Sequence, residues 1–368
     1  MSGKRILVTG PTGFIGLNLV EQLISQGHQV TALVRSSSSP AKTTLLKQMG
    51  ANLIQADLND PDSLALAVAG QQVIFHLAAV ARAVKLETFA QVNQIGFANL
   101  MQSAIATGSD AKIVFVSSLA AVGPSKFGRP HRECAAPQPI SNYGKSKRAA
   151  EELAQQFRDR LNISIVRPPI VLGPHDSRGF EIFKLIDRWG VHFNPSIRNE
   201  EYSVIHVADL CAALIAVAAN GQSVTPQDLN AGMYFAAGDE IISYQRLGSM
   251  IGQALGKEST FNFPVFRPIL RLIGGVNTTI GKLTGSPKFM NYDKVRDVTA
   301  GSWACENQKL KKETGFRFST SLTQRINQTA RWYYNEGWLK PKSAKNARQI
   351  PSTQSTHQSS NDAAMHVN

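Results

Sequence analysis

The 368-residue sequence has few cysteines and no long apolar run. Its three cysteines, Cys134, Cys211 and Cys305, are far apart and odd in number, which favours neither a disulfide framework nor a paired-cysteine zinc site. A reducing compartment, the cytoplasm, fits this usage. No stretch offers the roughly 20 apolar residues that a spanning helix needs, so any membrane contact is expected to be peripheral.

Acidic residues are also scarce, with 26 Asp and Glu against 39 Lys and Arg and a net charge of +13. The cations are scattered, and no zinc finger, aromatic RNA-binding signature or basic helix occurs, so a nucleic-acid partner is not expected. Residues 340–368 are rich in Ser, Gln and Asn, which predicts a disordered tail. The apolar run after Arg5 stops at Gly10, too early for a signal peptide.

Short apolar segments alternate with helical patterns through the first 170 residues. Strands are predicted at residues 5–9, 29–34, 52–56, 72–77, 112–117 and 163–167. Helices are predicted after Gly13, Pro40, Pro61, Leu86 and Tyr143. This alternation predicts an α/β fold, a Rossmann-type doubly wound parallel sheet with helices on both faces. Ligands bind such sheets at the carboxyl ends of the strands.

The predicted organisation has two parts and a tail. Residues 1–170 form the dinucleotide-binding domain, whose core shares parts of 204–220, and residues 171–339 form a smaller C-terminal substrate lobe with the closing helices. Residues 201–217 read as a strand that runs into a helix. Within it, His206 and Asp209 are expected to have a structural role where the two parts join, rather than to contact substrate.

The segment TGPTGFIG follows the first strand and places Gly10, Gly13 and Gly16 three residues apart. The first glycine permits a tight turn, the second lets a pyrophosphate approach the helix N-terminus, and the third allows close packing of helix on sheet. Because the triplet lies between a strand and an amphipathic helix, it predicts a dinucleotide site rather than a merely structural turn. The candidate contacts in this segment also include Thr12, Phe14 and Ile15.

Other strand ends supply further candidates for the same ligand. At the third strand, Asp57 could accept a hydrogen bond from adenine and Leu58 could cover the ring, although an Asp here could instead cap the next helix. The fourth strand ends in small residues that would leave room for a ribose. The candidate contacts there are Leu77, Ala78 and Ala79. His76 has no second ligand at a useful spacing, so we expect a packed strand residue and no metal site.

The second strand ends in Arg35, followed by Ser36, Ser37 and Ser38. An NAD site usually places Asp or Glu at this point, whereas a guanidinium can pair with the 2′-phosphate of NADP. The sequence therefore favours NADP(H), with NAD(H) as the other option. The alternative interpretation is a solvated Arg that opens a flexible serine loop.

Tyr143 and Lys147 are four residues apart, so they share one face of a predicted helix. This spacing is frequent by chance, and on the spacing alone an exposed amphipathic helix is the favoured interpretation. However, Ser118 lies at the carboxyl end of the fifth strand and gives both residues a partner in one pocket.

Together with TGPTGFIG, HLAA and Asp57-Leu58, this order resembles the extended branch of the short-chain dehydrogenase/reductase superfamily, the NAD-dependent epimerase/dehydratase family, over residues 4–338. The resemblance implies that Tyr143 exchanges a proton with the substrate oxygen, that Ser118 stabilises that oxygen, and that Lys147 lowers the pKa of the phenol and holds the nicotinamide ribose. It also implies a proton-relay role for Asn93, with bonding to local backbone as the alternative.

The segment RPPIVLGP after the sixth strand is implied to contact the nicotinamide end, and Pro168 is the candidate there. Sugar-nucleotide members usually have an aromatic-Asn pair here, whereas Pro168 and Pro169 resemble the hydroxysteroid dehydrogenase and dihydroflavonol reductase groups. The implied reaction interconverts a hydroxyl and a ketone on a small apolar substrate. Two alternatives are a sugar-nucleotide epimerase or dehydratase that retains NAD, and a non-catalytic dinucleotide sensor.

Residues 263–283 mix large apolar residues with cations. They could form an interfacial helix-loop-helix in weak contact with a membrane. Pro264, Pro268 and the Gly274-Gly275 pair favour instead a bent cover of short helices over the substrate lobe. A homodimer is compatible with the sequence.

Overall fold

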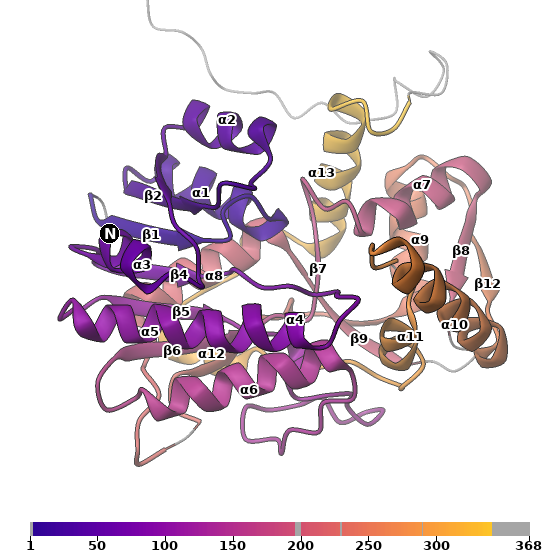
Figure 1. Cartoon of the computed structure of the whole chain (residues 1–368). Coiled ribbons are helices and arrows are strands. Elements are labelled where there is room, and N and C mark those ends of the chain that lie inside the picture. Colours follow the sequence, from indigo (N-terminus) through magenta and orange to yellow (C-terminus); the bar gives the residue numbers. More distant parts are fainter. Residues whose placement is uncertain (1–2, 196–199, 229, 289, 341–368) are drawn as a thin grey trace, which may run out of the picture.

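The computed structural model describes residues 3–195, 200–228, 230–288 and 290–340. Figure 1 shows a large α/β body that contains the N-terminus, with a smaller lobe beside it. In the body, seven parallel strands lie in the order β10-β6-β5-β4-β1-β2-β3. The strands are β1 (Arg5–Thr9), β2 (Gln29–Val34), β3 (Asn52–Gln55), β4 (Val73–His76), β5 (Lys112–Val116), β6 (Asn162–Arg167) and β10 (Met233–Phe235).

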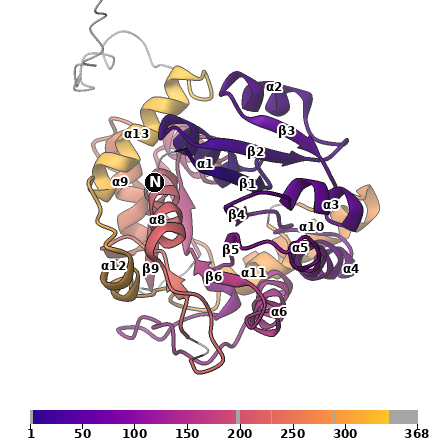
Figure 2. The same ribbon diagram turned by 90° about the vertical axis from the view of Figure 1, so that its left-hand side faces the viewer.

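Helices cover both faces of this sheet (Figure 2). One face packs against α1 (Phe14–Ser25) and α8 (Val207–Asn220), and the other against α3 (Pro61–Val68), α5 (Gly96–Ala106) and α6 (Asn142–Gln156). Alternate strand residues supply the two cores: Ile6 and Val8 face α1, whereas Leu7 faces α3 and α5. The predicted doubly wound fold is therefore confirmed, and each of the six predicted strands agrees with the structure to within one residue at each end.

Four shorter segments complete the body. They are α2 (Pro40–Gln48), α4 (Glu87–Phe89), the π-helical segment η1 (Ala90–Ile95) and the 3-10 turn η2 (Leu119–Ala121). The first three precede or follow strands at the positions that the sequence predicts for helices. The η1 segment runs directly into α5, so the helix predicted after Leu86 contains an irregular turn.

The lobe is built from two small sheets and several helices. Its strands are β7 (Ile170–Leu172), β9 (Glu201–His206) and β11 (Ile241–Ser243) in one sheet and β8 (Val191–Asn194) with β12 (Phe261–Pro264) in the other. Its helices are α7 (Gly179–Trp189), α9 (Tyr244–Ala254), α10 (Arg267–Thr284) and α11 (Tyr292–Val298). The closing helices α12 (Gln308–Thr314) and α13 (Leu322–Asn335) follow.

Two expectations about this half need correction. Met233–Phe235, which the sequence places in the substrate lobe, pairs with β6 and adds a seventh strand to the large sheet. Residues 267–284 form one continuous helix, not a series of short ones. Pro268 lies in the first turn, where the missing N–H has no helical partner to lose. The tail predicted at 340–368 lies, apart from its first residue, outside the described residues.

Candidate active site

The glycine turn lies at the carboxyl edge of the large sheet. Gly10 has a φ of +68°, and a Cβ added there would lie 2.8 Å from the backbone nitrogen of Ala78, so the ends of β1 and β4 meet at this point. A Cβ on Gly16 would collide with the carbonyl oxygen of Gly10. Gly13 is the N-cap of α1 and makes no side-chain cap, and the first turn of this helix contains no acidic residue. These features fit a pyrophosphate, because the helix N–H groups stay available to an anion.

The remaining residues of the turn lie where α1 begins. Phe14 and Ile15 open the helix and pack against the core on that face of the sheet. The carbonyl oxygen of Thr12 accepts a hydrogen bond from the Lys42 Nζ atom at 2.7 Å. Lys42 belongs to α2, so this bond brings a cation to the glycine turn.

Arg35 follows β2 directly, and its side chain is exposed. Its backbone N–H donates to the Ser38 hydroxyl at 3.0 Å, which closes the serine loop into a turn beside the glycine edge. No Asp or Glu occurs between Glu21 and Asp57. No carboxylate therefore stands near the end of β2 in the sequence to bind a ribose 2′-hydroxyl, and two cations are available there instead.

At the end of β3, the side chains of Asp57 and Leu58 make contacts within the protein. The Asp57 carboxylate accepts hydrogen bonds from the backbone and side-chain N–H groups of Asn59, both at 2.9 Å. The N-cap of α3 is Asp60, so Asp57 does not cap that helix. Leu58 is 8% exposed and packs in the core against Gly96, so its side chain is a core residue.

The end of β4 meets β1 through a buried pair. His76 Nδ1 lies 2.9 Å from Thr9 Oγ1, and the same hydroxyl accepts a hydrogen bond from the Ala78 N–H. Burial, assisted by the charge of Lys147, lowers the pKa of His76 to about 3. His76 is therefore a packed, neutral strand residue. Leu77 and Ala78 are half-buried and Ala79 is exposed, and all three follow the strand at the glycine edge.

Ser118, Tyr143 and Lys147 come together beyond β5. Ser118 follows that strand, and its side chain is hydrogen-bonded to Tyr143, which lies in the first turn of α6. One turn further along, the buried Lys147 donates from Nζ to the carbonyl oxygen of Val116 at 2.7 Å and lies 4.3 Å from the centre of the Phe115 ring. The structure thus joins the three residues that the sequence selects, and Lys147 is not on an exposed face.

The groups around the Tyr143 phenol shift its pKa in opposite directions. Burial raises the pKa of Tyr143, while the Ser118 hydrogen bond and the charge of Arg178 lower it and the charge of Asp297 raises it. Burial lowers the pKa of Lys147 to about 7, against the opposing charge of Glu151. The sequence predicts that Lys147 lowers the pKa of Tyr143, but Arg178 is the cation with that effect here.

Asn93 has a structural role that the sequence does not predict. It lies in η1, and its amide accepts from the Val80 N–H at 2.8 Å and donates to the Val80 carbonyl at 2.9 Å and the Ser146 hydroxyl at 2.8 Å. Both amide hydrogens are therefore used, which leaves none to hold a relay water. Asn93 bridges the loop after β4 to α6, and its partner is not the backbone of its own helix.

A buried ion pair joins α6 to the end of β6. Glu151 is fully buried, accepts two hydrogen bonds from Arg167 at 2.8 and 2.7 Å, and accepts another from the Ser117 hydroxyl at 2.6 Å. The sequence alone does not predict this pair. The feature of the sequence that could have indicated it is the position of Glu151, four residues after Lys147 on the same helical face. Pro168 follows Arg167 directly, and its carbonyl accepts from the Leu119 N–H at 2.9 Å, which ties the end of β6 to the turn after Ser118.

Residues of the lobe also contact the first turn of α6. Asp293 of α11 accepts hydrogen bonds from the backbone N–H groups of Asn142 at 2.8 Å and Tyr143 at 3.4 Å, and Asp297 bonds the Ser141 side chain. Arg178 precedes α7. No local pattern identifies these residues, because 150 residues separate Asp293 from Tyr143.

The two junction residues hold α8 to α13. His206 caps α8 through the Ala208 N–H at 3.2 Å and lies 3.2 Å from the Thr329 hydroxyl, while Asp209 forms an ion pair with Arg325. Burial raises the pKa of Asp209, which the ion pair with Arg325 opposes. These contacts give both residues the structural role that the sequence predicts.

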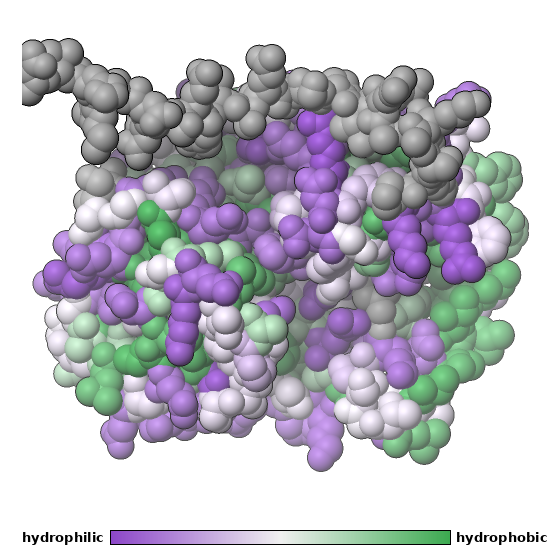
Figure 3. Space-filling view, turned by 90° about the horizontal axis from the view of Figure 1, so that it is seen from above, coloured by the Kyte–Doolittle hydropathy of each residue, from purple (hydrophilic) through white to green (hydrophobic). Residues whose placement is uncertain are grey.

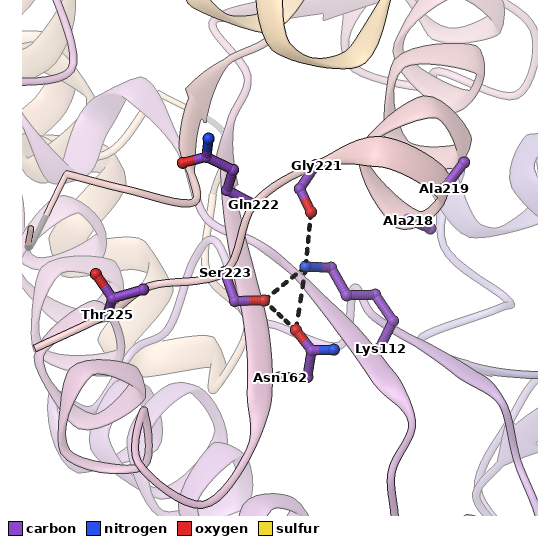
Figure 4. Close-up of a pocket in the computed structure, with 8 residues that line it drawn as sticks. All are labelled: Lys112, Asn162, Ala218, Ala219, Gly221, Gln222, Ser223 and Thr225. Atoms are coloured by element: carbon purple, nitrogen blue, oxygen red, sulfur yellow. Dashed lines mark hydrogen bonds between the residues drawn. The ribbon is translucent and has the colours of Figure 1, made fainter.

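A cavity of about 490 Å³ lies elsewhere, where β5 and β6 begin (Figure 4). In it, Lys112 Nζ donates to the Ser223 hydroxyl at 2.7 Å, the Gly221 carbonyl at 3.0 Å and the Asn162 side chain at 3.4 Å. These bonds tie the segment after α8 to the sheet. Because the cavity is at the amino edge and contains none of the residues around Tyr143, we do not assign it to the active site. In the described ranges, no cluster of three or more His, Cys, Asp or Glu side chains is arranged to hold a metal ion.

Comparison with known proteins finds one matching family model, relatives that align over most of the chain, and solved structures of the same fold. The model of the NAD dependent epimerase/dehydratase family matches residues 6–232. The chain is 29% identical to a ceramide reductase of Caulobacter vibrioides over 91% of this chain and 96% of that protein. It is 30% identical to a Synechocystis protein assigned provisionally as a dihydroflavonol 4-reductase, over 90% and 95% of the two chains. A dTDP-glucose 4,6-dehydratase from Streptomyces venezuelae, solved with NAD, has the same fold, with a TM-score of 0.71, 22% identity and coverage of 91% and 98%.

Proposed function

The chain belongs to the NAD-dependent epimerase/dehydratase family and is an oxidoreductase-type enzyme, and from that premise we propose that it interconverts a hydroxyl and a ketone on an apolar substrate. The hydrogen bond between Ser118 and Tyr143, with Lys147 one turn along the same helix, carries this proposal. These residues lie beyond β5, two strands along the carboxyl edge from the glycine turn that follows β1.

A nicotinamide cofactor bound at the glycine turn would supply or accept the hydride of this reaction. Tyr143 passes the proton to the ketone oxygen or takes it from the hydroxyl. Ser118 donates a hydrogen bond to the same oxygen as negative charge develops on it. The charge of Arg178 favours the phenolate form of Tyr143, and Lys147, one helical turn away, would hold the nicotinamide ribose.

Two observations support an apolar substrate. Pro168 and Pro169 occupy the segment after β6, where sugar-nucleotide members of the family usually carry an aromatic-Asn pair. Two relatives that match nine-tenths or more of this chain are named as reductases, of ceramide in one case and, provisionally, of a dihydroflavonol in the other. We therefore assign the reduction of an apolar ketone, or its reverse, rather than epimerisation of a sugar nucleotide.

The preferred cofactor in this proposal is NADP(H). Arg35 is exposed at the end of β2, and Lys42 extends from α2 to the Thr12 carbonyl. Both cations are on the side of the glycine turn where the adenosine ribose of a bound dinucleotide lies in this fold. A guanidinium can form two parallel hydrogen bonds to a 2′-phosphate, whereas the sequence between Glu21 and Asp57 supplies no carboxylate to bind the 2′-hydroxyl.

Two measurements test the proposal. First, the purified protein is denatured and any released nucleotide is identified. Second, nicotinamide oxidation is followed with a hydroxysteroid ketone, a dihydroflavonol, a ceramide-type ketone and a nucleotide sugar, each with NADPH or NADH. We expect exchangeable NADPH and turnover of an apolar ketone. Tightly retained NAD with turnover of the nucleotide sugar alone would replace this function with the epimerase alternative.

A further inference from the structure

One helix of the lobe exposes an unusually apolar surface. On α10, the side chains of six large apolar residues are between 39% and 82% exposed: Ile269, Leu272, Ile273, Val276, Ile280 and Leu283. At 3.6 residues per turn, these positions fall within an arc of about 100°. They therefore form one continuous stripe, which we call the α10 face.

The opposite side of α10 is fixed to the protein. Leu270, Gly274 and Gly281 are buried, and a Cβ on Gly274 would lie 2.7 Å from the Val295 Cγ2 atom. Asn277 donates to the Met290 carbonyl at 2.9 Å. The rotation of α10 about its axis is thus set by α11 and the segment before it, and this rotation leaves the α10 face outward.

Apolar side chains continue the surface beyond the helix. Phe266 precedes α10 and is 59% exposed, and Phe261 and Phe263 of the adjacent β12 are 64% and 47% exposed. Figure 3 shows hydrophobic side chains gathered along the side of the molecule that bears α10 and β12 in Figure 1. Single exposed apolar residues are ordinary, whereas a contiguous patch marks an interaction surface.

The charge of this segment identifies the partner. Residues 261–292 contain no Asp or Glu but four cations, Arg267, Arg271, Lys282 and Lys288. Arg267 lies 3.9 Å from Glu200, while Arg271 and Lys282 are exposed. Long cationic side chains can extend past an apolar stripe to reach lipid phosphates.

We propose that the α10 face docks on the surface of an anionic lipid bilayer. A helix with one apolar face and cations on its polar side lies in the interface, and its affinity combines apolar burial with attraction to anionic lipid. The described helices include none that is long and apolar enough to cross a bilayer.

Docking would place the lipid surface near the catalytic helix. The inner side of α10 packs on α11, and α11 supplies the Asp293 carboxylate that binds the backbone of Tyr143. An apolar substrate dissolved in the bilayer would then meet the lobe on its docked side. This consequence rests on the proposed function, whereas the docking itself does not.

The full-length protein is tested by flotation with vesicles of phosphatidylcholine, alone or equimolar with phosphatidylglycerol. The variant Leu272→Ser/Val276→Ser removes part of the stripe, and Arg271→Gln/Lys282→Gln removes two of the exposed cations. Leu66→Ser on α3 is the matched control, because Leu66 is 76% exposed and Leu272 is 69% exposed. Melting temperatures and turnover of a water-soluble ketone report that each variant is folded.

We expect the unmodified protein to float with the anionic vesicles. The serine variant should lower the partition coefficient about tenfold or more, and the charge variant about fivefold per cation, with Leu66→Ser unchanged. A protein that stays out of the anionic vesicle fraction at low salt overturns the proposal. A protein that binds no vesicles but self-associates with rising concentration, and loses this self-association in Leu272→Ser/Val276→Ser, also overturns the proposal. The partner of the α10 face is then a second copy. Vesicle binding that persists in both α10 variants shows that another surface is responsible and also overturns it.

Discussion

The Asp293 carboxylate of the lobe binds the backbone N–H of Tyr143 at 3.4 Å and that of Asn142 at 2.8 Å. A carboxylate at this place both satisfies helix N–H groups and complements the positive end of the helix dipole. Because the first turn of α6 carries the Tyr143 phenol, which we propose as the proton donor, the position of the lobe and the position of Tyr143 are linked. Asp293 is therefore a positioning residue.

The first prediction concerns this link. Asp293→Ala should lower the free energy of unfolding by about 1 kcal/mol, the typical value of a lost helix cap, because two N–H groups lose their acceptor. We also expect kcat to fall while nucleotide affinity stays constant, since the phenol moves and the glycine turn does not. Urea denaturation and steady-state kinetics measure both. Asp293→Asn keeps an acceptor oxygen and should recover part of kcat; equal losses in the two variants would argue against positioning by the cap.

The second prediction concerns the proton donor. Tyr143→Phe removes the hydroxyl that exchanges the proton, so turnover should fall about 100- to 10,000-fold with little change in cofactor affinity. Ser118→Ala should cost about 100- to 1,000-fold, because it removes one donor to the developing oxyanion. Tyr292→Phe, at a half-exposed tyrosine of α11, is the control and should retain full activity. A loss below tenfold in Tyr143→Phe would remove Tyr143 from the reaction.

The third prediction concerns pH. In the oxidation direction, kcat/KM rises with pH as the Tyr143 phenol deprotonates. The charge of Arg178 lowers the pKa of Tyr143 and that of Asp297 raises it. Arg178→Gln should therefore move the rise to higher pH, and Asp297→Asn should move it to lower pH.

Arg188→Gln is the matched control for Arg178, since it removes the same charge from the other end of α7. Its pH profile should coincide with that of the unmodified enzyme. If the Arg178 and Asp297 variants shift the profile in the same direction, charge at these two positions does not control the phenol.

Local patterns predict six of the seven strands of the large sheet and the glycine turn, but not β10. Strand β1 is a buried apolar run that ends at Gly10, whose positive φ and contact with Ala78 both require a small residue. Ser118 and Tyr143 could be found because each stands at a fixed place after a strand or within a helix turn. Their features are present in short stretches of sequence, where propensity and periodicity act.

Long-range packing explains what sequence could not predict. Gly274 suggests a helix break. In the structure it lies inside α10, and a glycine occupies this position because Val295 leaves no room for a Cβ. Asn93 looks like a residue for local backbone or a relay water, but its partners are the loop at Val80 and the hydroxyl of Ser146. Such choices depend on elements that meet only in the folded chain.

The fourth prediction concerns the buried ion pair beneath the site. Glu151→Gln leaves the guanidinium of Arg167 buried without its carboxylate, so the free energy of unfolding should fall by about 3–5 kcal/mol. Glu152→Gln removes the neighbouring exposed carboxylate, which pairs with Arg148 at 2.9 Å, and should change stability by about 1 kcal/mol or less. Urea unfolding of both variants gives the comparison. Similar values for the two would mean that the buried pair is not what stabilises this helix.

The fifth prediction concerns the cofactor. A charge-assisted hydrogen bond contributes about 1.5 to 3 kcal/mol, so Arg35→Ala should weaken NADPH binding roughly 10- to 100-fold. NADH has no 2′-phosphate, and its affinity should be nearly unchanged. Arg160→Ala is the control, because Arg160 is exposed just before β6, at the edge of the sheet opposite the glycine turn. Direct titration of each variant with both nucleotides separates the effects. If the unmodified protein binds NADH as tightly as NADPH, then Arg35 does not recognise the phosphate, and the absence of a carboxylate between Glu21 and Asp57 has another cause.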